Sequence, residues 1–349
     1  MKRRITKPVF VGGVQIGGGA PVVVQSMTKT DTRDAASTVR QIWELTEAGC
    51  EIVRVAVPDE EAAGALAGII KSVKIPVIAD IHFDYRLALA ALRAGAAGLR
   101  INPGNIGGTD RVREVAMAAK ERDIPVRIGV NAGSLSREIL QKHGGITPSA
   151  LVESAMEYIR MLEQMDFYNI KVSLKASHVP LMVEAYRQLA QRVDYPLHVG
   201  VTEAGLPPAG VIKSAVGIGI LLSEGIGDTI RVSLTGDPCL EVNAAYEILK
   251  ALDLRRRGPE LISCPTCGRT QVDLVKIARE VEERLKGVKR PIKVAVMGCA
   301  VNGPGEAREA DVGLAAGRGA GIIFRKGKLV RRVREDRLVD ELMAEIEKL

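Results

Sequence analysis

Three cysteines in the last quarter of the 349-residue chain have the spacing of soft-metal ligands. Cys264 and Cys267 form a C-x₂-C pair, and Cys299 follows in a glycine-rich segment. Thiolates are the preferred ligands of zinc, copper(I) and iron–sulfur clusters. A fourth cysteine nearby would indicate a structural zinc site, but only the carboxylate of Glu306 is at hand. Three firm ligands and one replaceable ligand predict a centre that does chemistry.

The other two cysteines and the N-terminal residues indicate the cellular compartment of the protein. Cys50 and Cys239 fall at the edges of helical patterns, where we expect small buried hydrophobic side chains rather than ligands. An odd count of five cysteines argues against a disulfide framework. The basic N-terminus leads into no apolar signal segment, and no run of about 18 apolar residues occurs. We therefore expect a cytoplasmic protein without a membrane span.

The positive charge is concentrated in the C-terminal part. Residues 1–254 contain 28 basic and 28 acidic side chains, and residues 255–349 contain 21 and 14, which gives the net charge of +7. Aromatic residues make up only 3% of the chain, so stacking platforms for nucleic acid are missing. A basic face beside a redox centre suits an acidic protein partner, although any single charge there is most simply a solvated surface residue.

The first 254 residues repeat one pattern, in which a short apolar run ends in a polar residue and an amphipathic helix follows. Eight such runs occur, at 22–26, 52–57, 76–81, 98–101, 126–130, 170–174, 197–201 and 229–234. The helical patterns cover 35–48, 60–71, 85–94, 111–122, 149–165, 179–192, 207–223 and 240–252. Eight βαβ units predict a (β/α)₈ TIM barrel. A doubly wound open sheet is the alternative, but it usually has fewer strands.

The pattern changes at residues 255–259, where we place the boundary of a second domain, 255–349. A helix is expected at about 270–285, opened by the C-x₂-C pair, with strands at 292–296, 311–315, 319–324 and 328–333 and a final helix at 335–349. This predicts a small α+β domain. Near the N-terminus, the glycine-rich segment 11–19 is followed by no helix, so it indicates a hairpin that closes the bottom of the barrel rather than a nucleotide loop.

Polar and charged residues recur at the predicted strand ends. They are Arg54, Asp80, His82, Arg100, Asn102, Arg127, Asn131, Lys171, Ser173, Lys175, Thr202, Glu203, Arg231 and Ser233. The catalytic groups of such barrels come from the C-terminal ends of the strands. A basic side chain inside an apolar barrel must be paired or must face a ligand. Five strands that carry Arg or Lys predict a diphosphate pocket, with interstrand ion pairs to Asp80 and Glu203 as the alternative.

Two of these residues are candidates for proton chemistry. Glu203 lies among many cations, which favour its ionised form, and it is placed to exchange a proton with a bound substrate. His82 lies beside Asp80 at a strand end, where a satisfied core histidine and a functional one are equally compatible with the pattern.

The chain closely resembles the 4-hydroxy-3-methylbut-2-enyl diphosphate synthase family of the non-mevalonate isoprenoid pathway, in its two-domain bacterial form. The resemblance covers essentially the whole length and rests on VQSMT at 24–28, ADIHF at 79–83, RINPGN at 100–105, RIGVN at 127–131, GVTEAG at 200–205, SCPTCGR at 263–269 and NGPGE at 302–306. No departure occurs at the ligand positions.

The resemblance implies a 4Fe–4S cluster held by Cys264, Cys267, Cys299 and Glu306. It further implies an oxidoreductase that reductively opens 2-C-methyl-D-erythritol 2,4-cyclodiphosphate with loss of water, with Glu203 and Glu306 as catalytic residues. The barrel, 1–254, would bind the substrate and the tail, 255–349, the cluster. Flavodoxin or ferredoxin would supply electrons, and a head-to-tail homodimer would combine each barrel with its partner's tail.

Two other classes of protein remain compatible with parts of the pattern. A phosphate-binding barrel transferase with a structural zinc domain would be colourless and would hold zinc. A nucleic-acid-binding protein would show steep salt dependence of its affinity for oligonucleotides. An iron–sulfur enzyme purified without air would instead be brown and would contain iron and sulfide.

Overall fold

The computed structural model describes residues 2–299 and 307–349. The chain divides into two compact units, residues 1–255 and 256–349. Within the described residues, no helix has the length and the apolar character needed to cross a membrane.

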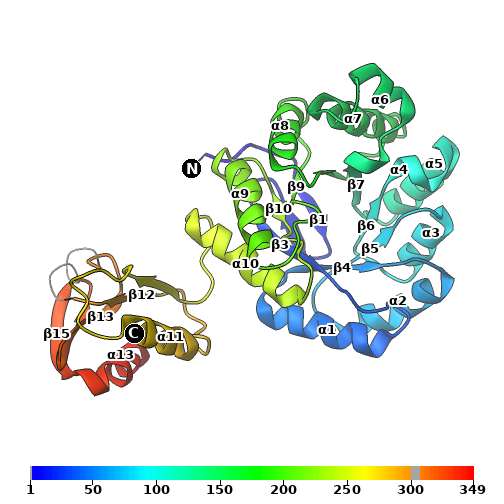
Figure 1. The fold of residues 1–349 in the computed structure, drawn as a ribbon. Coiled ribbons are helices and arrows are strands. Elements are labelled where there is room, and N and C mark those ends of the chain that lie inside the picture. The colour runs from blue at the N-terminus through cyan, green and yellow to red at the C-terminus, as the bar shows by residue number, and fades with distance from the viewer. Residues whose placement is uncertain (1, 300–306) are drawn as a thin grey trace. The chain divides into compact units, whose positions relative to one another are not determined.

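The first unit contains eight parallel strands. They are β3 (Val23–Met27), β4 (Ile52–Ala56), β5 (Val77–Ile81), β6 (Gly98–Ile101), β7 (Val126–Asn131), β8 (Ile170–Lys175), β9 (His198–Val199) and β10 (Thr229–Ile230). Their order is β8-β7-β6-β5-β4-β3-β10-β9, and a parallel bridge from Val172 to Leu197 joins the two ends. Figure 1 shows the strands at the centre and helices around them. The predicted TIM barrel is confirmed. Its strands are buried on both faces, and they are apolar apart from a few charged or polar residues such as Asp80 and Arg127.

Helices follow the strands and cover the outside of the barrel. The eight predicted ones are α1 (Ala35–Ala48), α2 (Glu60–Ser72), α3 (Tyr85–Arg93), α5 (Gly108–Lys120), α7 (Pro148–Gln164), α8 (Val179–Ala190), α9 (Ala209–Ser223) and α10 (Pro238–Ala251). Most begin at a side chain that accepts a hydrogen bond from the first turn, as Asp34 does from Ser37 N and Asp59 does from Ala62 N. The short helices α4 (Pro103–Ile106) and α6 (Arg137–His143) and a 3₁₀ turn at Ala132–Ser134 were not predicted.

A hairpin closes the N-terminal end of the barrel. Strands β1 (Val9–Val11) and β2 (Val14–Ile16) pair in antiparallel fashion around Gly12, whose φ of 56° suits glycine. Val11 and Ile16 pack against Val23, Ile52 and Ile78, which lie at or near the starts of three barrel strands. The predicted hairpin is therefore confirmed, and the open end of the barrel is the one formed by the C-terminal strand ends. We call this end the mouth.

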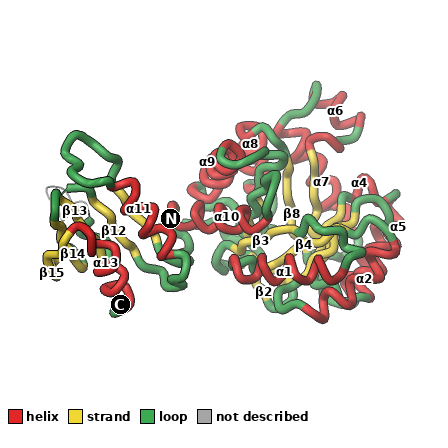
Figure 2. Tube along the Cα trace, turned by 60° about the horizontal axis from the view of Figure 1, so that its bottom comes forward, coloured by secondary structure: helices red, strands yellow, loops and turns green. Residues whose placement is uncertain are grey.

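The second unit is a five-stranded sheet covered by two helices. Strands β11 (Glu260–Ser263), β12 (Lys293–Met297) and β13 (Val312–Gly317) are parallel, and β14 (Ala320–Arg325) and β15 (Lys328–Arg334) continue in antiparallel fashion. Helices α11 (Leu274–Leu285) and α13 (Leu338–Glu347) pack on the face that carries Val294, Val296 and Leu314. A 3₁₀ turn, Glu335–Arg337, precedes α13. Figure 2 shows the two helices beside these strands.

Two expectations about this unit were incomplete. Strand β11 was not predicted, because four residues at the edge of a sheet carry little pattern of their own. Helix α11 begins at Leu274 rather than near residue 270, since the side chain of Asp273 accepts a hydrogen bond from Lys276 N and starts the helix there. The C-x₂-C pair consequently lies in the loop between β11 and α11, and it does not open the helix.

Candidate active site

Four charged residues form one row around part of the barrel. The strand register pairs Asp80 with Arg100, Arg100 with Arg127 and Arg127 with Lys171, on four neighbouring strands. All four side chains are buried. Register partners in a sheet project from the same face, and two and four residues beyond Lys171 on the same strand, Ser173 and Lys175 line a cavity at the mouth. The row therefore lies on the inner face of the barrel.

Asp80 is the counter-ion of two of the predicted cations. Its carboxylate lies 3.3 Å from Arg54 Nε and 3.0 Å from Arg100 Nη1, and Arg100 Nη1 also donates to His82 Nε2 at 2.7 Å. Burial disfavours the charged carboxylate, but Arg54, His82 and Arg100 outweigh burial and hold the pKa of Asp80 well below its usual value. Interstrand ion pairing, the alternative to a phosphate pocket, thus applies to Arg54 and Arg100.

Arg127 and Lys171 have no such partner among the residues that the structure describes. All three guanidinium nitrogens of Arg127 and the ammonium of Lys171 are buried without a hydrogen bond. Burial, with Arg127 beside it, lowers the pKa of Lys171 to about 7. Burial also lowers the pKa of Arg127, and Arg54 and Arg100 add to that effect. Since unpaired buried charges are costly, these two residues indicate an anion site.

A glycine makes room for this cluster. A Cβ on Gly129, two residues after Arg127 on β7, would lie 2.7 Å from Arg100 Nε. The guanidinium of Arg100 therefore lies directly against the backbone of β7. Its Nε and Nη2 are buried and have no hydrogen-bond partner in the described part of the chain.

A narrow cavity opens at the mouth beside these cations. Its lining residues are Arg54, Ser173, Lys175, Tyr186, His198, Gly200, Val201, Thr202, Arg231 and Ser233. Six of them were predicted site residues; Tyr186 and His198 were missed. Its volume is only about 30 Å³, so a diphosphate would have to lie across its entrance or displace lining side chains. Burial, followed by the charges of Arg54, Arg100 and Arg127, also lowers the pKa of Lys175.

Asp80, His82, Arg100, Arg127 and Lys171 do not line this cavity, and neither do three further predicted residues at the strand ends. Asn102 precedes α4, and its Nδ2 donates to Ser134 Oγ at 3.1 Å. Asn131 ends β7 and has a buried Oδ1 without a partner among the described residues. Glu203 is exposed, and its φ of 53° places a non-glycine residue in the left-handed region. Such a conformation is uncommon and costs about 1 kcal/mol or more.

The sequence also missed a buried acid. The strand-end pattern offers Asp80 and Glu203 as partners for the cations, but Glu241 also reaches Arg231 from helix α10, with its Oε2 3.5 Å from Arg231 Nη2. Glu241 lies on the buried face of an amphipathic helix, where its position in the sequence gives no sign of contact with the mouth.

The cysteines of the second unit lie at the ends of neighbouring strands. Cys264 directly follows β11, and Cys299 follows β12 by two residues. Because β11 and β12 are parallel, with Ser263 opposite Val296, both loops leave the same edge of the sheet. The two loops touch, since Cys264 Sγ accepts a hydrogen bond from Gly298 N at 3.3 Å.

The described residues do not themselves complete a metal site. Within residues 2–299 and 307–349, no group of three or more His, Cys, Asp or Glu side chains is close enough to hold a metal ion. Glu306, the predicted fourth ligand, lies outside the described residues. Cys267 is exposed, and a hydrogen bond from the backbone of Arg269 lowers the pKa of its thiol. Three soft sulfur donors on two touching loops at one sheet edge are a donor set that fits an iron–sulfur cluster.

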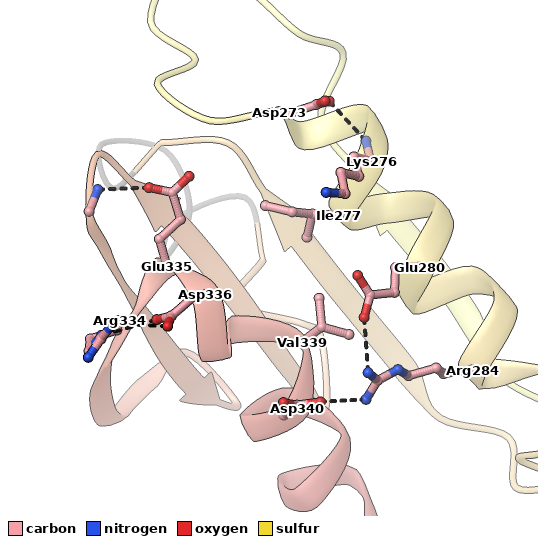
Figure 3. A pocket seen from close by; sticks show the side chains of 11 residues that line it. Asp273, Lys276, Ile277, Glu280, Arg284, Arg334, Glu335, Asp336, Val339 and Asp340 are labelled. Carbon is pink, nitrogen blue, oxygen red and sulfur yellow. Dashed lines mark hydrogen bonds and ion pairs between the residues drawn. The ribbon is translucent and has the colours of Figure 1, made fainter.

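A larger hollow, of about 700 Å³, lies between α11, α13 and β15 but holds none of the predicted site residues. Figure 3 shows ion pairs among several of its charged side chains, while Asp273 and Glu335 accept hydrogen bonds from backbone nitrogens. Arg284 binds Glu280 and Asp340, and Arg334 binds Asp336. Both arginines that line the hollow are therefore already paired with carboxylates. The size of the hollow alone does not make it a functional site.

Both units match a known protein family. The sequence model of the GcpE TIM-barrel domain matches residues 6–246, and that of the GcpE protein C-terminal domain matches residues 260–348. Among solved structures, the barrel is similar to dihydropteroate synthases from Stenotrophomonas maltophilia (TM-score 0.52, 13% identity, 71% of this chain and 98% of that chain) and Yersinia pestis (TM-score 0.51, 11% identity, 70% and 98%). At such identities the likeness concerns the fold alone.

Relatives of known name match nearly the whole chain. Proteins called 4-hydroxy-3-methylbut-2-en-1-yl diphosphate synthase (flavodoxin) are 61% identical in Maridesulfovibrio salexigens, over 99% of this chain and 97% of that protein, and 60% identical in Thermodesulfovibrio yellowstonii, over all of both chains. The one from Clostridium perfringens is 59% identical over 99% of both. With both of its units matched and such identity along its length, the chain belongs to the GcpE family.

Proposed function

We propose that this chain is a 4-hydroxy-3-methylbut-2-en-1-yl diphosphate synthase, which reductively opens 2-C-methyl-D-erythritol 2,4-cyclodiphosphate and releases water. The observation that carries the proposal at the barrel is the pair of buried, unpartnered cations, Arg127 and Lys171. A diphosphate supplies the anionic oxygens that these groups lack. Full-length relatives that carry this name support the same activity.

The barrel residues bind and orient the substrate. Arg54, Arg100, Arg127, Lys171, Lys175 and Arg231 surround the diphosphate with charge, while Asp80 fixes Arg54 and Arg100 by ion pairs. Thr202, Ser173 and Ser233 offer hydroxyl groups at the cavity, and Asn102, Asn131 and His82 lie at the neighbouring strand ends. Glu203 follows Thr202 in the loop after β9 and would hold the proton that leaves with the substrate hydroxyl as water.

The second unit would hold a 4Fe–4S cluster on Cys264, Cys267, Cys299 and Glu306. When bound, the cluster supplies electrons and a Lewis-acidic iron for cleavage of a carbon–oxygen bond. The contact of Cys264 Sγ with the backbone beside Cys299 supports this ligand set. A carboxylate is a weaker partner for iron than a thiolate is, so Glu306 would be the most easily displaced of the four ligands.

The electron donor would be flavodoxin, as the names of the relatives indicate. The excess of 21 basic over 14 acidic residues in 255–349 would attract a donor of acidic surface. Ferredoxin, a second small acidic carrier, is the alternative donor.

Each active site would combine the barrel of one subunit with the cluster of another. Arg255, the last residue of the barrel unit, donates to Val22 O at 2.7 Å and binds the carboxylate of Glu51. Val22 and Glu51 directly precede β3 and β4, so the chain leaves the barrel at the end opposite the mouth. A head-to-tail homodimer brings a cluster to each mouth without requiring the linker to wrap around its own barrel.

The test is purification without air, followed by iron and sulfide assays, the visible spectrum and turnover of the cyclic diphosphate with reduced flavodoxin. We expect a brown protein with four iron atoms per chain that forms the linear diphosphate. A colourless zinc protein without turnover would overturn the proposal in favour of the transferase class, and salt-sensitive oligonucleotide binding without turnover would favour a nucleic-acid-binding protein.

A further inference from the structure

Glu241 is a buried carboxylate at the mouth to which the proposed function assigns no role. It lies on α10, and only 1% of its side chain is exposed. Oε2 accepts from Ser26 Oγ at 3.2 Å and lies 3.5 Å from Arg231 Nη2. Oε1 accepts from Leu234 N at 3.0 Å and lies 3.0 Å from Lys29 Nζ. One carboxylate thus contacts the strand β3, the loop after β3 and the segment that follows β10.

The segment held by Glu241 forms one wall of the cavity. Arg231 and Ser233 line the cavity, and Leu234 follows them directly. Lys29 strengthens the attachment, because its ammonium donates to Leu234 O at 2.7 Å and to Gly236 O. The guanidinium of Arg231 contacts Glu241 through Nη2, at 3.5 Å, and Met27 Sδ through Nη1, at 3.8 Å. Its buried Nε has no hydrogen-bond partner among the described residues.

Two effects of this carboxylate on anion binding oppose each other. Its negative charge lowers the positive potential of the pocket and so weakens the attraction of a diphosphate. Its contacts fix the direction of the Arg231 guanidinium, and a fixed donor binds an anion better than a mobile one does. Glu241 already has hydrogen bonds from Leu234 and Ser26 and an ion pair with Lys29, so its contact with Arg231 is not needed to satisfy the carboxylate.

We propose that Glu241 is a positioning residue, which orients Arg231 and the wall of the cavity toward the diphosphate, and that orientation outweighs the cost of its negative charge. This inference rests on the proposed diphosphate pocket. It predicts that the loss of a negative charge from a cationic pocket makes anion binding weaker rather than tighter.

Two substitutions in the full-length, cluster-loaded enzyme separate position from charge. Glu241→Gln keeps the size and removes the charge, and Glu241→Asp keeps the charge and withdraws it from Arg231. Titration calorimetry with inorganic pyrophosphate is expected to show about tenfold weaker binding for both variants, the size of one lost hydrogen bond to a charged group. With the cyclic diphosphate, KM should rise by a similar factor while kcat changes less.

Glu247→Gln is the matched control, because Glu247 lies on the same helix with 69% of its side chain exposed and pairs with Lys250. This variant should bind pyrophosphate like the unmodified protein. In an Arg231→Met background, Glu241→Gln should weaken pyrophosphate binding less than it does in the unmodified protein, since one of the two elements that Glu241 orients is gone. An undiminished effect there would mean that Glu241 does not act through Arg231.

The possible results are distinguishable. Tighter binding by Glu241→Gln with unchanged binding by Glu241→Asp would mean that only charge matters and would overturn the inference. Should Glu241→Gln fail to fold, Glu241→Asp decides alone, with unchanged affinity counting against the inference. If the unmodified protein does not bind pyrophosphate, the diphosphate pocket fails and the inference fails with it.

Discussion

Arg127 and Lys171 are register partners on the neighbouring strands β7 and β8, and both are buried without a hydrogen-bond partner among the described residues. Two like charges side by side in the barrel interior repel each other and have lost their water. The folded protein without substrate therefore carries an energetic cost at these positions. An anion that binds there removes this cost, so stability and substrate binding make opposite demands on the two residues.

Replacement of the unpaired cations is expected to stabilise the substrate-free protein. Arg127→Met and Lys171→Met should each raise the free energy of unfolding by about 1–3 kcal/mol, the cost of an unsatisfied buried polar group, as measured by denaturant titration. Arg100→Met should instead destabilise by about 3–5 kcal/mol, because it deprives the buried Asp80 of a partner. Arg33→Met, at an exposed ion pair, is the control and should leave the free energy of unfolding nearly unchanged. Equal destabilisation by all three barrel variants would contradict this view.

Substitution of the barrel cations should also weaken substrate binding. Loss of Arg54, Arg100, Arg127, Lys171 or Arg231 should each cost roughly 2–5 kcal/mol of diphosphate affinity, by analogy with truncated buried charge pairs. The decisive measurement is the affinity of an Arg100→Ala, Arg127→Ala double variant for the cyclic diphosphate. Unchanged affinity in that variant would remove the phosphate pocket from consideration.

Lys171 should make stability depend on pH. Its pKa falls from 10.5 in the unfolded chain to about 7 in the fold. Below about pH 7 both states are protonated, and the folded state carries the whole cost of the buried charge. Between about pH 7 and 10.5 only the unfolded chain keeps the proton, so the free energy of unfolding rises with pH. Denaturant titrations should show this rise in the unmodified protein and a smaller one in Lys171→Met; identical pH profiles would refute it.

Diphosphate binding should consequently be accompanied by proton uptake. An anion beside Lys171 favours its charged form and raises its pKa again, so near neutral pH the complex binds a proton that the free protein lacks. Calorimetry with pyrophosphate in buffers of different ionisation enthalpy measures the number of protons taken up on binding. Fewer protons should be taken up by Lys171→Met than by the unmodified protein. Equal proton uptake by the two proteins would mean that a group other than Lys171 binds the proton.

The cysteine substitutions test the cluster ligands. Cys264→Ser, Cys267→Ser and Cys299→Ser should each abolish cluster retention, because a hydroxyl does not ionise near neutral pH and cannot replace a thiolate. Cys239→Ser, at a half-buried cysteine of the barrel unit, is the control and should retain full iron. Glu306→Ala should keep a cluster but impair turnover. Full iron content and activity in Cys299→Ser would refute the ligand set.

Hybrid dimers test the cross-chain site. A Glu203→Ala protein and a Cys264→Ser protein should each be inactive, and their mixture should regain partial activity. The hybrid dimer contains one site in which an intact barrel faces an intact cluster. An active monomer, or no recovery after verified exchange of subunits, would count against a site shared between chains.

Local signals were sufficient for much of the barrel. Helix α1 occupies the predicted residues 35–48 because local contacts set both of its ends. The side chain of Asp34 accepts a hydrogen bond from Ser37 N at the start, and the N–H of Gly49 donates to Leu45 O and Thr46 O at the end. The barrel strands were visible because burial on both faces leaves them mostly apolar. The polar residues at their ends were predictable site candidates, since parallel strands bring equivalent ends to one mouth.

Only the tertiary structure decided which of these residues are paired. The register places Asp80 beside Arg100 and leaves Arg127 beside Lys171, and no local pattern specifies register between strands that are 20 or more residues apart. Glu241 stayed hidden because helix periodicity assigns a buried position but does not say what lies across it. Strand β11 exists through its pairing with β12, and this pairing brings the loops of Cys264 and Cys299 to one edge. The sequence determined which chemical groups the protein has; long-range packing, which depends on contacts far apart in the chain, decided which of them remain free to bind a ligand.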